Sequence, residues 1–131
     1  MIGVDTNVLV RHLVKDDPSR AEDARRFLDG RSPDDPAYVS TAVIVETISV
    51  LGRIYRVQRA DIVRILETLL RSRDILIESA ASLRRSLADA EEANTDIADA
   101  IITHAAIDAG CDWTVTFDKR AQRLLGMLPV G

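Results

Sequence analysis

The sequence predicts a single α/β domain over residues 1–131, with a central parallel sheet of four to five strands flanked by about seven helices. Three observations favour this class. Short apolar runs alternate with longer amphipathic segments along the whole chain. Two of the short runs end in an aspartate that begins a helix, at Asp5 and at Asp118. The length of 131 residues and the hydrophobic fraction of 47% allow one sizeable core.

The composition is that of a soluble globular protein, which we expect in the cytoplasm. No apolar run reaches the roughly 18 residues that cross a membrane, and no basic signal region precedes the first strand. The one cysteine, Cys111, allows no intrachain disulfide and reads as a small core residue in a reducing compartment. Besides it there are only two imidazoles, so a thiolate or imidazole zinc site is not available. Any metal would be held by oxygen.

The net charge of −4 argues against a broad basic face for nonspecific duplex binding. A local basic patch remains possible, because arginines gather in the middle of the chain: Arg53, Arg56, Arg59, Arg64, Arg71 and Arg73. Planar guanidinium groups suit phosphate or carboxylate recognition, whereas a solvated helix face is the default explanation.

The elements follow from periodicity and from turn signals, taken in order. The apolar run that ends at Val4 reads as a buried parallel strand, and Asp5-Thr6-Asn7 begins a short amphipathic helix. Pro18 opens a second, mostly polar helix that runs to about Leu28. A loop rich in proline and aspartate then leads to a short strand over 38–40. The remaining expected elements are helices over 41–55 and 59–71, a strand over 74–77, helices over 80–93 and 94–109, a strand over 113–117, a helix over 118–125 and an edge strand over 127–130.

Asp5 is the first candidate functional residue. In an open α/β sheet, ligands bind outside the carboxyl ends of the strands, which is the expected position of Asp5. The alternative is structural, because aspartate is a favoured helix N-cap whose oxygen accepts from free backbone amides. Asp118 follows the strand over 113–117 in the same way and has the same alternative.

Glu46 is the second candidate. From Ala42 to Leu51 the helix is apolar or hydroxyl-bearing on every side, which is the pattern of a buried helix, and Glu46 is its single charge. A lone buried carboxylate costs several kcal/mol unless it is neutralised, paired or bound to a cation. A solvated edge of the helix is the alternative position for Glu46.

The helix over 94–109 supplies further carboxylates. At 100° per residue, one narrow stripe carries Asp96, Asp99, Ala100 and Thr103. Asn94 or Thr95 can cap this helix, so Asp99 is not needed for capping, whereas the helix dipole accounts for Asp96. The small side chain of Ala100 leaves room for a ligand to approach.

If these carboxylates converge, their mutual repulsion raises their pKa values and destabilises the fold unless a divalent cation is bound. Hard oxygen ligands without histidine or cysteine select Mg²⁺ or Mn²⁺. Such a metal polarises a phosphoryl oxygen and lowers the pKa of a bound water, which indicates phosphodiester hydrolysis. Thr6, Asn7 and Thr116 would then orient ligands or waters.

Four segments, in this order and spacing, resemble the PIN domain, specifically the VapC-type toxins of toxin-antitoxin modules: Ile2-Gly-Val-Asp-Thr-Asn7, Val45-Glu46, Asp96-Ile-Ala-Asp-Ala100-Ile-Ile and Val115-Thr-Phe-Asp118. The resemblance covers essentially the whole chain. It implies a small α/β fold and a Mg²⁺- or Mn²⁺-dependent endoribonuclease. Carried over by motif, the catalytic acids are Asp5, Glu46, Asp99 and Asp118, with Asp96 as an extra metal-binding carboxylate.

The resemblance also implies partners: an RNA substrate, a second copy of the chain in a homodimer, and a cognate VapB-type antitoxin. Thr6, Asn7 and Thr116 match the family's supporting hydroxyl and amide positions. Candidates for RNA or antitoxin contacts are Arg11, Arg53, Arg56 and Arg59. Of the two neighbouring acids we favour Asp99 over Asp96 as the closer metal ligand, because it lies deeper in its helix and has no capping alternative.

Two other classes of function fit parts of the sequence. Phosphotransfer through an aspartyl intermediate would use Asp5 as nucleophile, but Asn7 stands where that chemistry wants a second acid, and Lys119 comes only after Asp118. A non-catalytic partner-binding module on the same fold is the other alternative. The four acids disfavour it, since a pure binding surface has no use for buried carboxylates.

Overall fold

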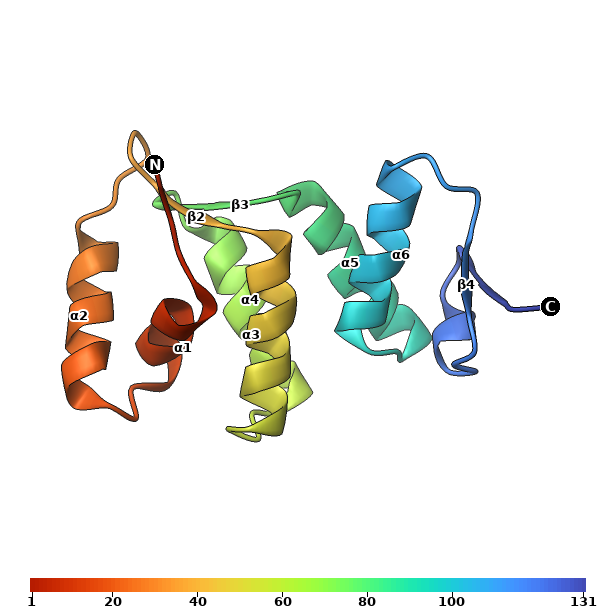
Figure 1. Cartoon of the computed structure of the whole chain (residues 1–131), viewed down its shortest axis with the longest axis horizontal. Coiled ribbons are helices and arrows are strands. Elements are labelled where there is room, and N and C mark those ends of the chain that lie inside the picture. Colours follow the sequence, from red (N-terminus) through yellow and green to blue (C-terminus); the bar gives the residue numbers. More distant parts are fainter. The chain divides into compact units, whose positions relative to one another are not determined.

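The computed structural model describes all residues, Met1–Gly131, and divides into two compact units, Met1–Glu78 and Ser79–Gly131. The elements of both units are labelled in Figure 1. Each unit is described by itself. That residues 1–131 form a single domain stays a prediction.

The first unit contains a three-stranded parallel sheet in the order β1-β2-β3. Its strands are β1 (Ile2–Gly3), β2 (Ala37–Val39) and β3 (Ile75–Ile77). The central strand is the buried one: it pairs on both sides, and its outer residues Ala37 and Val39 are 0% and 1% exposed. The expectation of a buried first strand is wrong, because β1 forms an edge of this sheet and Ile2 is 45% exposed.

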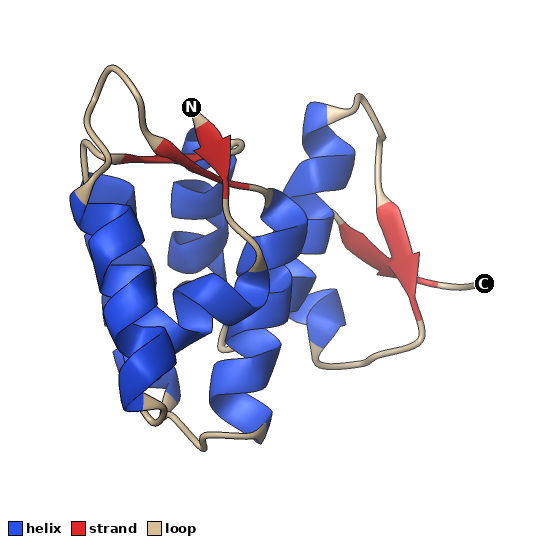
Figure 2. Cartoon of the chain, turned by 60° about the vertical axis from the view of Figure 1, so that its left-hand side comes forward, coloured by secondary structure: helices blue, strands red, loops and turns tan.

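Four helices complete the first unit, and sequence signals account for their starts. They are α1 (Thr6–Val14), α2 (Pro18–Asp29), α3 (Thr41–Arg53) and α4 (Arg59–Arg71). Asp17 caps α2 by accepting from an amide of the first turn, with Pro18 at the first helical position, and Ser40 caps α3 in the same way. Figure 2 shows these helices gathered below the strands of the sheet.

The core of the first unit lies between these helices. Its largest fully buried apolar side chains come from α1, α3, α4 and β2: Leu9, Ile44, Leu51, Leu66 and Val39. Helix α3 is buried only along Ile44, Thr47 and Leu51, so the expectation of a helix buried on every side is wrong. A run of apolar residues cannot show from sequence which of its faces another element covers.

The second unit pairs two helices with a small sheet. Helices α5 (Ala80–Ala93) and α6 (Ile97–Asp108) pack closely through small residues, because Ser86, Ala90 and Ala100 are all 0% exposed. The Ser86 hydroxyl donates to the carbonyl of Ser82 at 2.8 Å and lies 3.3 Å from that of Ala100, which satisfies it between the helices. Strands β4 (Thr114–Thr116) and β5 (Met127–Pro129) pair in parallel.

The α/β class with parallel strands is confirmed, and three details differ from the expectation. The five strands form one sheet of three and one of two, because pairing depends on contacts that periodicity does not encode. The helix expected over 118–125 is a single turn of 3-10 helix, η1 (Ala121–Arg123), which ends before Gly126 at a φ of +101°. Cys111 is exposed rather than in the core, because it lies in the turn that leaves α6.

The structure thus has six α-helices and η1 where the sequence predicts about seven helices. None of them combines the length and the apolar character that crossing a bilayer requires.

Candidate active site

Asp5 occupies the N-cap of α1, directly after β1 and the buried Val4. Its Oδ1 accepts a hydrogen bond from the backbone amide of Thr6 at 2.8 Å. The capping interpretation is therefore confirmed. It leaves Oδ2 without a protein partner on an exposed side chain, so Asp5 has a carboxylate oxygen available for a ligand.

Thr6 connects the start of α1 to α3. The Thr6 side chain is buried, with 6% exposed, and its Oγ1 donates to Oε1 of Glu46. Glu46 itself is exposed, so the expected burial of this carboxylate is wrong and the solvated edge is its observed position. A hydroxyl held in the core thus fixes the orientation of a carboxylate that faces solvent.

These residues surround a cavity of about 320 Å³, which we call the acidic cavity. The predicted residues that line it are Asp5, Thr6, Asn7, Arg11 and Glu46, and the lining also includes Val10, Val50 and Tyr55. The first unit therefore brings together five of the residues singled out in the sequence.

Asp16 and Tyr55 form a network at the acidic cavity that the sequence did not reveal. The Arg11 guanidinium donates to Asp16 Oδ1 at 2.8 Å, and the Tyr55 hydroxyl donates to Oδ2 at 2.9 Å. The Tyr55 hydroxyl and the Arg11 guanidinium, in that order, lower the pKa of Asp16, and the bond to Asp16 raises the pKa of Tyr55. Because 39 residues separate Tyr55 from Asp16, helical periodicity gave no signal for this contact.

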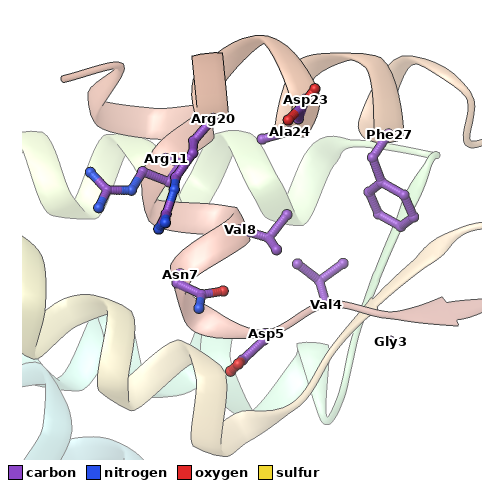
Figure 3. Close-up of a pocket in the computed structure, with 10 residues that line it drawn as sticks. All are labelled: Gly3, Val4, Asp5, Asn7, Val8, Arg11, Arg20, Asp23, Ala24 and Phe27. Carbon is purple, nitrogen blue, oxygen red and sulfur yellow. The ribbon is translucent and has the colours of Figure 1, made fainter. Parts of the chain in front are cut away.

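A second, larger cavity of about 510 Å³ lies between α1 and α2 (Figure 3), and we call it the α1–α2 groove. Its lining residues are Gly3, Val4, Asp5, Asn7, Val8, Arg11, Arg20, Asp23, Ala24 and Phe27. Asp5, Asn7 and Arg11 line both cavities, so the two meet at the first turns of α1.

The second unit holds the other predicted acids. Asp96 is the N-cap residue of α6 but makes no side-chain capping bond, and its Oδ1 lies 3.4 Å from Nη1 of Arg120. Asp99 lies in the first turn of α6. Burial raises the pKa of Asp99, and the charges of Asp96 and Asp118 raise it further, whereas Arg120 opposes the shift. The three carboxylates therefore interact electrostatically.

Asp118 is held by backbone amides at the turn between β4 and η1. Its Oδ1 accepts from the amide of Arg120 at 2.8 Å and from that of Ala121 at 3.3 Å. Oγ1 of Thr116 accepts from the amide of Asp118 at 3.0 Å. The predicted supporting residue Thr116 thus braces the backbone that presents the carboxylate rather than the carboxylate itself.

One expectation about a neighbouring residue is not met. Ala100 offers no space to a ligand, because it is fully buried against Ser86 of α5. Arg53, Arg56 and Arg59 line neither the acidic cavity nor the α1–α2 groove, and that they contact RNA or an antitoxin stays a prediction.

The donor set suits a hard divalent cation. Within each unit, no group of three or more carboxylate, imidazole or thiol side chains is close enough together to hold a metal alone. Mg²⁺, however, keeps several waters and commonly binds through one or two carboxylates together with substrate phosphate. Asp5 and Glu46, which line one cavity, meet that requirement with oxygen ligands alone.

The chain matches a known protein family. The family model described as PIN domain matches residues 2–125 of the chain. Among curated proteins, none gives a significant match.

Proposed function

The chain belongs to the PIN domain family, which is generally a nuclease fold, and on this premise we propose that it is a divalent-metal-dependent endoribonuclease. Its substrate is single-stranded or structured RNA, in which it hydrolyses phosphodiester bonds. We further propose that it acts in the cytoplasm as the toxin of a type II toxin-antitoxin module, as a homodimer neutralised by a VapB-type antitoxin. The proposed catalytic carboxylates are Asp5, Glu46, Asp99 and Asp118.

The observation that carries the proposal is the pair of carboxylates at the acidic cavity. Asp5 and Glu46 come from different helices, and each is oriented by Thr6, the first through the backbone amide and the second through the hydroxyl. Orientation before a ligand arrives is what a site for metal and phosphate requires, because the donors then need no reorganisation on binding. Capping of α1 by Asp5 would not by itself explain why Glu46 is hydrogen-bonded to Thr6 in the first turn of the same helix.

The carboxylates of the second unit support the proposal through their charge. Asp99 is partly desolvated and lies in the fields of Asp96 and Asp118, and both effects disfavour its ionised form. Keeping Asp99 ionised in this position costs folding free energy. A bound divalent cation would remove that cost.

The residues have separable roles in the proposed reaction. PIN nucleases usually use divalent metals, and Mg²⁺ or Mn²⁺ would here polarise a phosphoryl oxygen and acidify a water. Asp5 and Glu46 would hold the metal in the first unit, and Asp99 and Asp118, with Asp96, are the proposed ligands of the second. Asn7 offers an amide to a water or a phosphate oxygen.

Cleavage of RNA by the purified protein tests the proposal. Total RNA is incubated with Mn²⁺, with Mg²⁺ and with chelator, and the new ends are mapped. Asp5→Asn and Glu46→Gln are run alongside, with Glu67→Gln as the matched control because Glu67 is an exposed acid on α4 that lines neither cavity. We expect metal-dependent cuts at a few discrete sites in the wild type and the control only.

The alternative is a non-catalytic PIN-fold module that binds a partner. Absence of RNA cleavage under all conditions, with the antitoxin shown to be absent from the preparation, would favour the binding module. Equal cleavage by Asp5→Asn and by the wild type would instead place the chemistry elsewhere in the chain.

A further inference from the structure

The α1–α2 groove has a regular construction. Successive turns of two helices form its walls: Val8 and Arg11 from α1, and Arg20, Ala24 and Phe27 from α2. The spacings of three and four residues put each set on one helix face. A groove built on two helices that pack against each other is a preformed surface rather than a loop that closes on a ligand.

The groove has two chemically different ends. Figure 3 shows Arg11 and Arg20 toward one end and the ring of Phe27 at the other. Val8 and Val4 lie between them, and the carboxylate of Asp23 is drawn beside Ala24, so the cationic end and the aromatic end are separate.

The ring of Phe27 is in contact with a guanidinium. The Arg31 guanidinium lies over the ring, with its Cζ 4.8 Å from the centroid. Arg31 is itself fixed by an ion pair to Asp35 at 3.0 Å. A ring held in this way has a defined orientation beside the groove that it lines, which favours stacking of a planar group.

The cationic end has guanidinium groups that can reach an anion. Arg20 is 68% exposed and its only ion pair, with Asp17, is long at 3.7 Å. Arg11 is bound to Asp16 through Nη1 alone, which leaves its other donors available. Two guanidiniums that line the same groove suit a phosphate, because each can donate to separate phosphate oxygens.

We propose that the α1–α2 groove is a nucleotide subsite, in which the base of one substrate nucleotide stacks on Phe27 and its phosphate contacts Arg11 and Arg20. This inference rests on the proposed function and extends it to the recognition of a base beside the scissile phosphate. The link is Asp5, which lines the groove and the acidic cavity, so a strand held in the groove continues to the proposed metal ligands. The volume of about 510 Å³ lies within the range of small-ligand sites.

The first test uses neither metal nor turnover. The full ¹⁵N-labelled chain is titrated, in chelator, with each of the four ribonucleoside 5′-monophosphates and with inorganic phosphate. We expect saturable amide shifts at Val8, Ala24 and Phe27 with at least one nucleotide, and shifts confined to the Arg20 end with phosphate. Residues around the separate cavity near Asp89 and Leu124 should not respond.

Variants identify the groups responsible. Phe27→Leu keeps apolar bulk but removes the stacking face, and we expect it to weaken nucleotide binding about 5-fold or more, since stacking of a base on an aromatic ring contributes that much or more. Arg20→Gln should weaken both nucleotide and phosphate. Its matched control is Arg64→Gln, because Arg64 is 75% exposed, has a similarly long pair with an aspartate three residues away, and lines neither cavity.

The outcomes separate this inference from the proposed function. Absence of saturable shifts at groove residues up to about 20 mM, where a millimolar site would be filled, overturns the subsite and favours a partner protein's helix as the occupant. Unchanged nucleotide affinity in Phe27→Leu and Arg20→Gln overturns it as well. Nucleotide binding by a chain that never cleaves RNA retains the subsite while the proposed function fails.

If the wild type cleaves RNA, a pool of oligoribonucleotides randomised around the cut site supplies a second readout. We expect Phe27→Leu to lose the base preference at one position and to raise KM about 5-fold or more, with kcat within about 2-fold of the wild type. A base preference and a KM that are both unchanged would overturn the subsite although cleavage itself continues.

Discussion

The hydroxyl of Thr6 in α1 donates a hydrogen bond to the Glu46 carboxylate in α3, 40 residues further along the chain. The donor is buried and the acceptor is exposed. The orientation of the Glu46 side chain is therefore fixed by a residue of the buried core, although Glu46 itself is exposed to solvent. The consequence for activity can be tested with one atom-scale change.

Thr6→Val removes this donor while keeping the shape of the side chain. We expect cleavage to fall by about 10-fold to 100-fold, the usual effect of losing a group that orients a metal ligand. The free energy of unfolding should change by about 1 kcal/mol or less, because one hydrogen bond to a solvated acceptor is lost. Kinetics and thermal unfolding measure the two effects.

Thr68→Val is the control for this change, since the Thr68 hydroxyl also makes one hydrogen bond, to the backbone carbonyl of Arg64 on α4. It should cleave like the wild type. Equal losses in the two variants would show that Thr6 acts through general stability.

Asp99→Asn should stabilise the metal-free protein at neutral pH. Burial and two neighbouring carboxylates raise the pKa of Asp99 in the folded state, so at pH values between the unfolded and the folded pKa the folded state retains a proton that the unfolded state has lost. Stability contributed by the protonated form is present below the unfolded pKa and is lost as pH rises through the folded pKa. The difference in Tm between variant and wild type, measured in chelator, should therefore be largest near pH 7 and should shrink below the ordinary pKa of 3.8.

Asp74→Asn tests whether this effect is specific, because Asp74 is an exposed acid in the first unit. A Tm gain of the same size in Asp74→Asn would contradict the electrostatic account. Loss of cleavage in Asp99→Asn despite its higher Tm would show that Asp99 is needed for activity and not for stability of the fold.

Tyr55→Phe should destabilise the protein in a way that depends on pH. Bonds from Tyr55 and Arg11 lower the pKa of Asp16, so this group contributes stability above its ordinary pKa of 3.8 and loses it as pH falls through the lower, folded value. We expect a lower Tm than wild type at pH 7 and a smaller difference as pH falls below 3.8 and Asp16 becomes protonated in the folded state as well. In an Asp16→Asn background the effect of Tyr55→Phe should no longer vary across that range.

Divalent cation should stabilise the wild type and not the ligand variants. A ligand that binds only the folded state contributes about 2.7 kcal/mol at 100 times its Kd, which thermal unfolding resolves easily. We expect Mn²⁺ to raise the Tm of the wild type and of Asp108→Asn, a control acid paired with Arg85, but to have little effect on Asp5→Asn. Equal Mn²⁺ responses in all three would mean that the cation binds elsewhere.

The sequence predicted those parts of the fold that depend on local pattern. The helices over 59–71 and 80–93 match α4 and α5, because long amphipathic periods leave little choice of structure. The predictions of a longer helix at η1 and of a buried Glu46 were wrong, because both features depend on which other elements pack against the segment. Strands of two or three residues are too short for their hydrophobic pattern to indicate which other strands they pair with.

The candidate site divides in the same way. Asp5, Thr6 and Asn7 were found because a strand that stops at a polar triplet is a local signal, and the structure places Glu46 at the same cavity. Their catalytic role stays a prediction. The sequence does not identify Tyr55 and Phe27 as lining residues, since each falls within an expected helix and neither carries a charge that periodicity leaves unexplained.

The shared position of Asp5 has a consequence for chemical inhibition. One carboxylate borders both the acidic cavity and the α1–α2 groove, which has an aromatic ring at one end. A compound with a chelating head and a flat, hydrophobic tail would therefore span both regions from a single anchoring point. Its selectivity would come from the tail, because the residues around the tail, Val8, Ala24 and Phe27, are not among the proposed metal ligands.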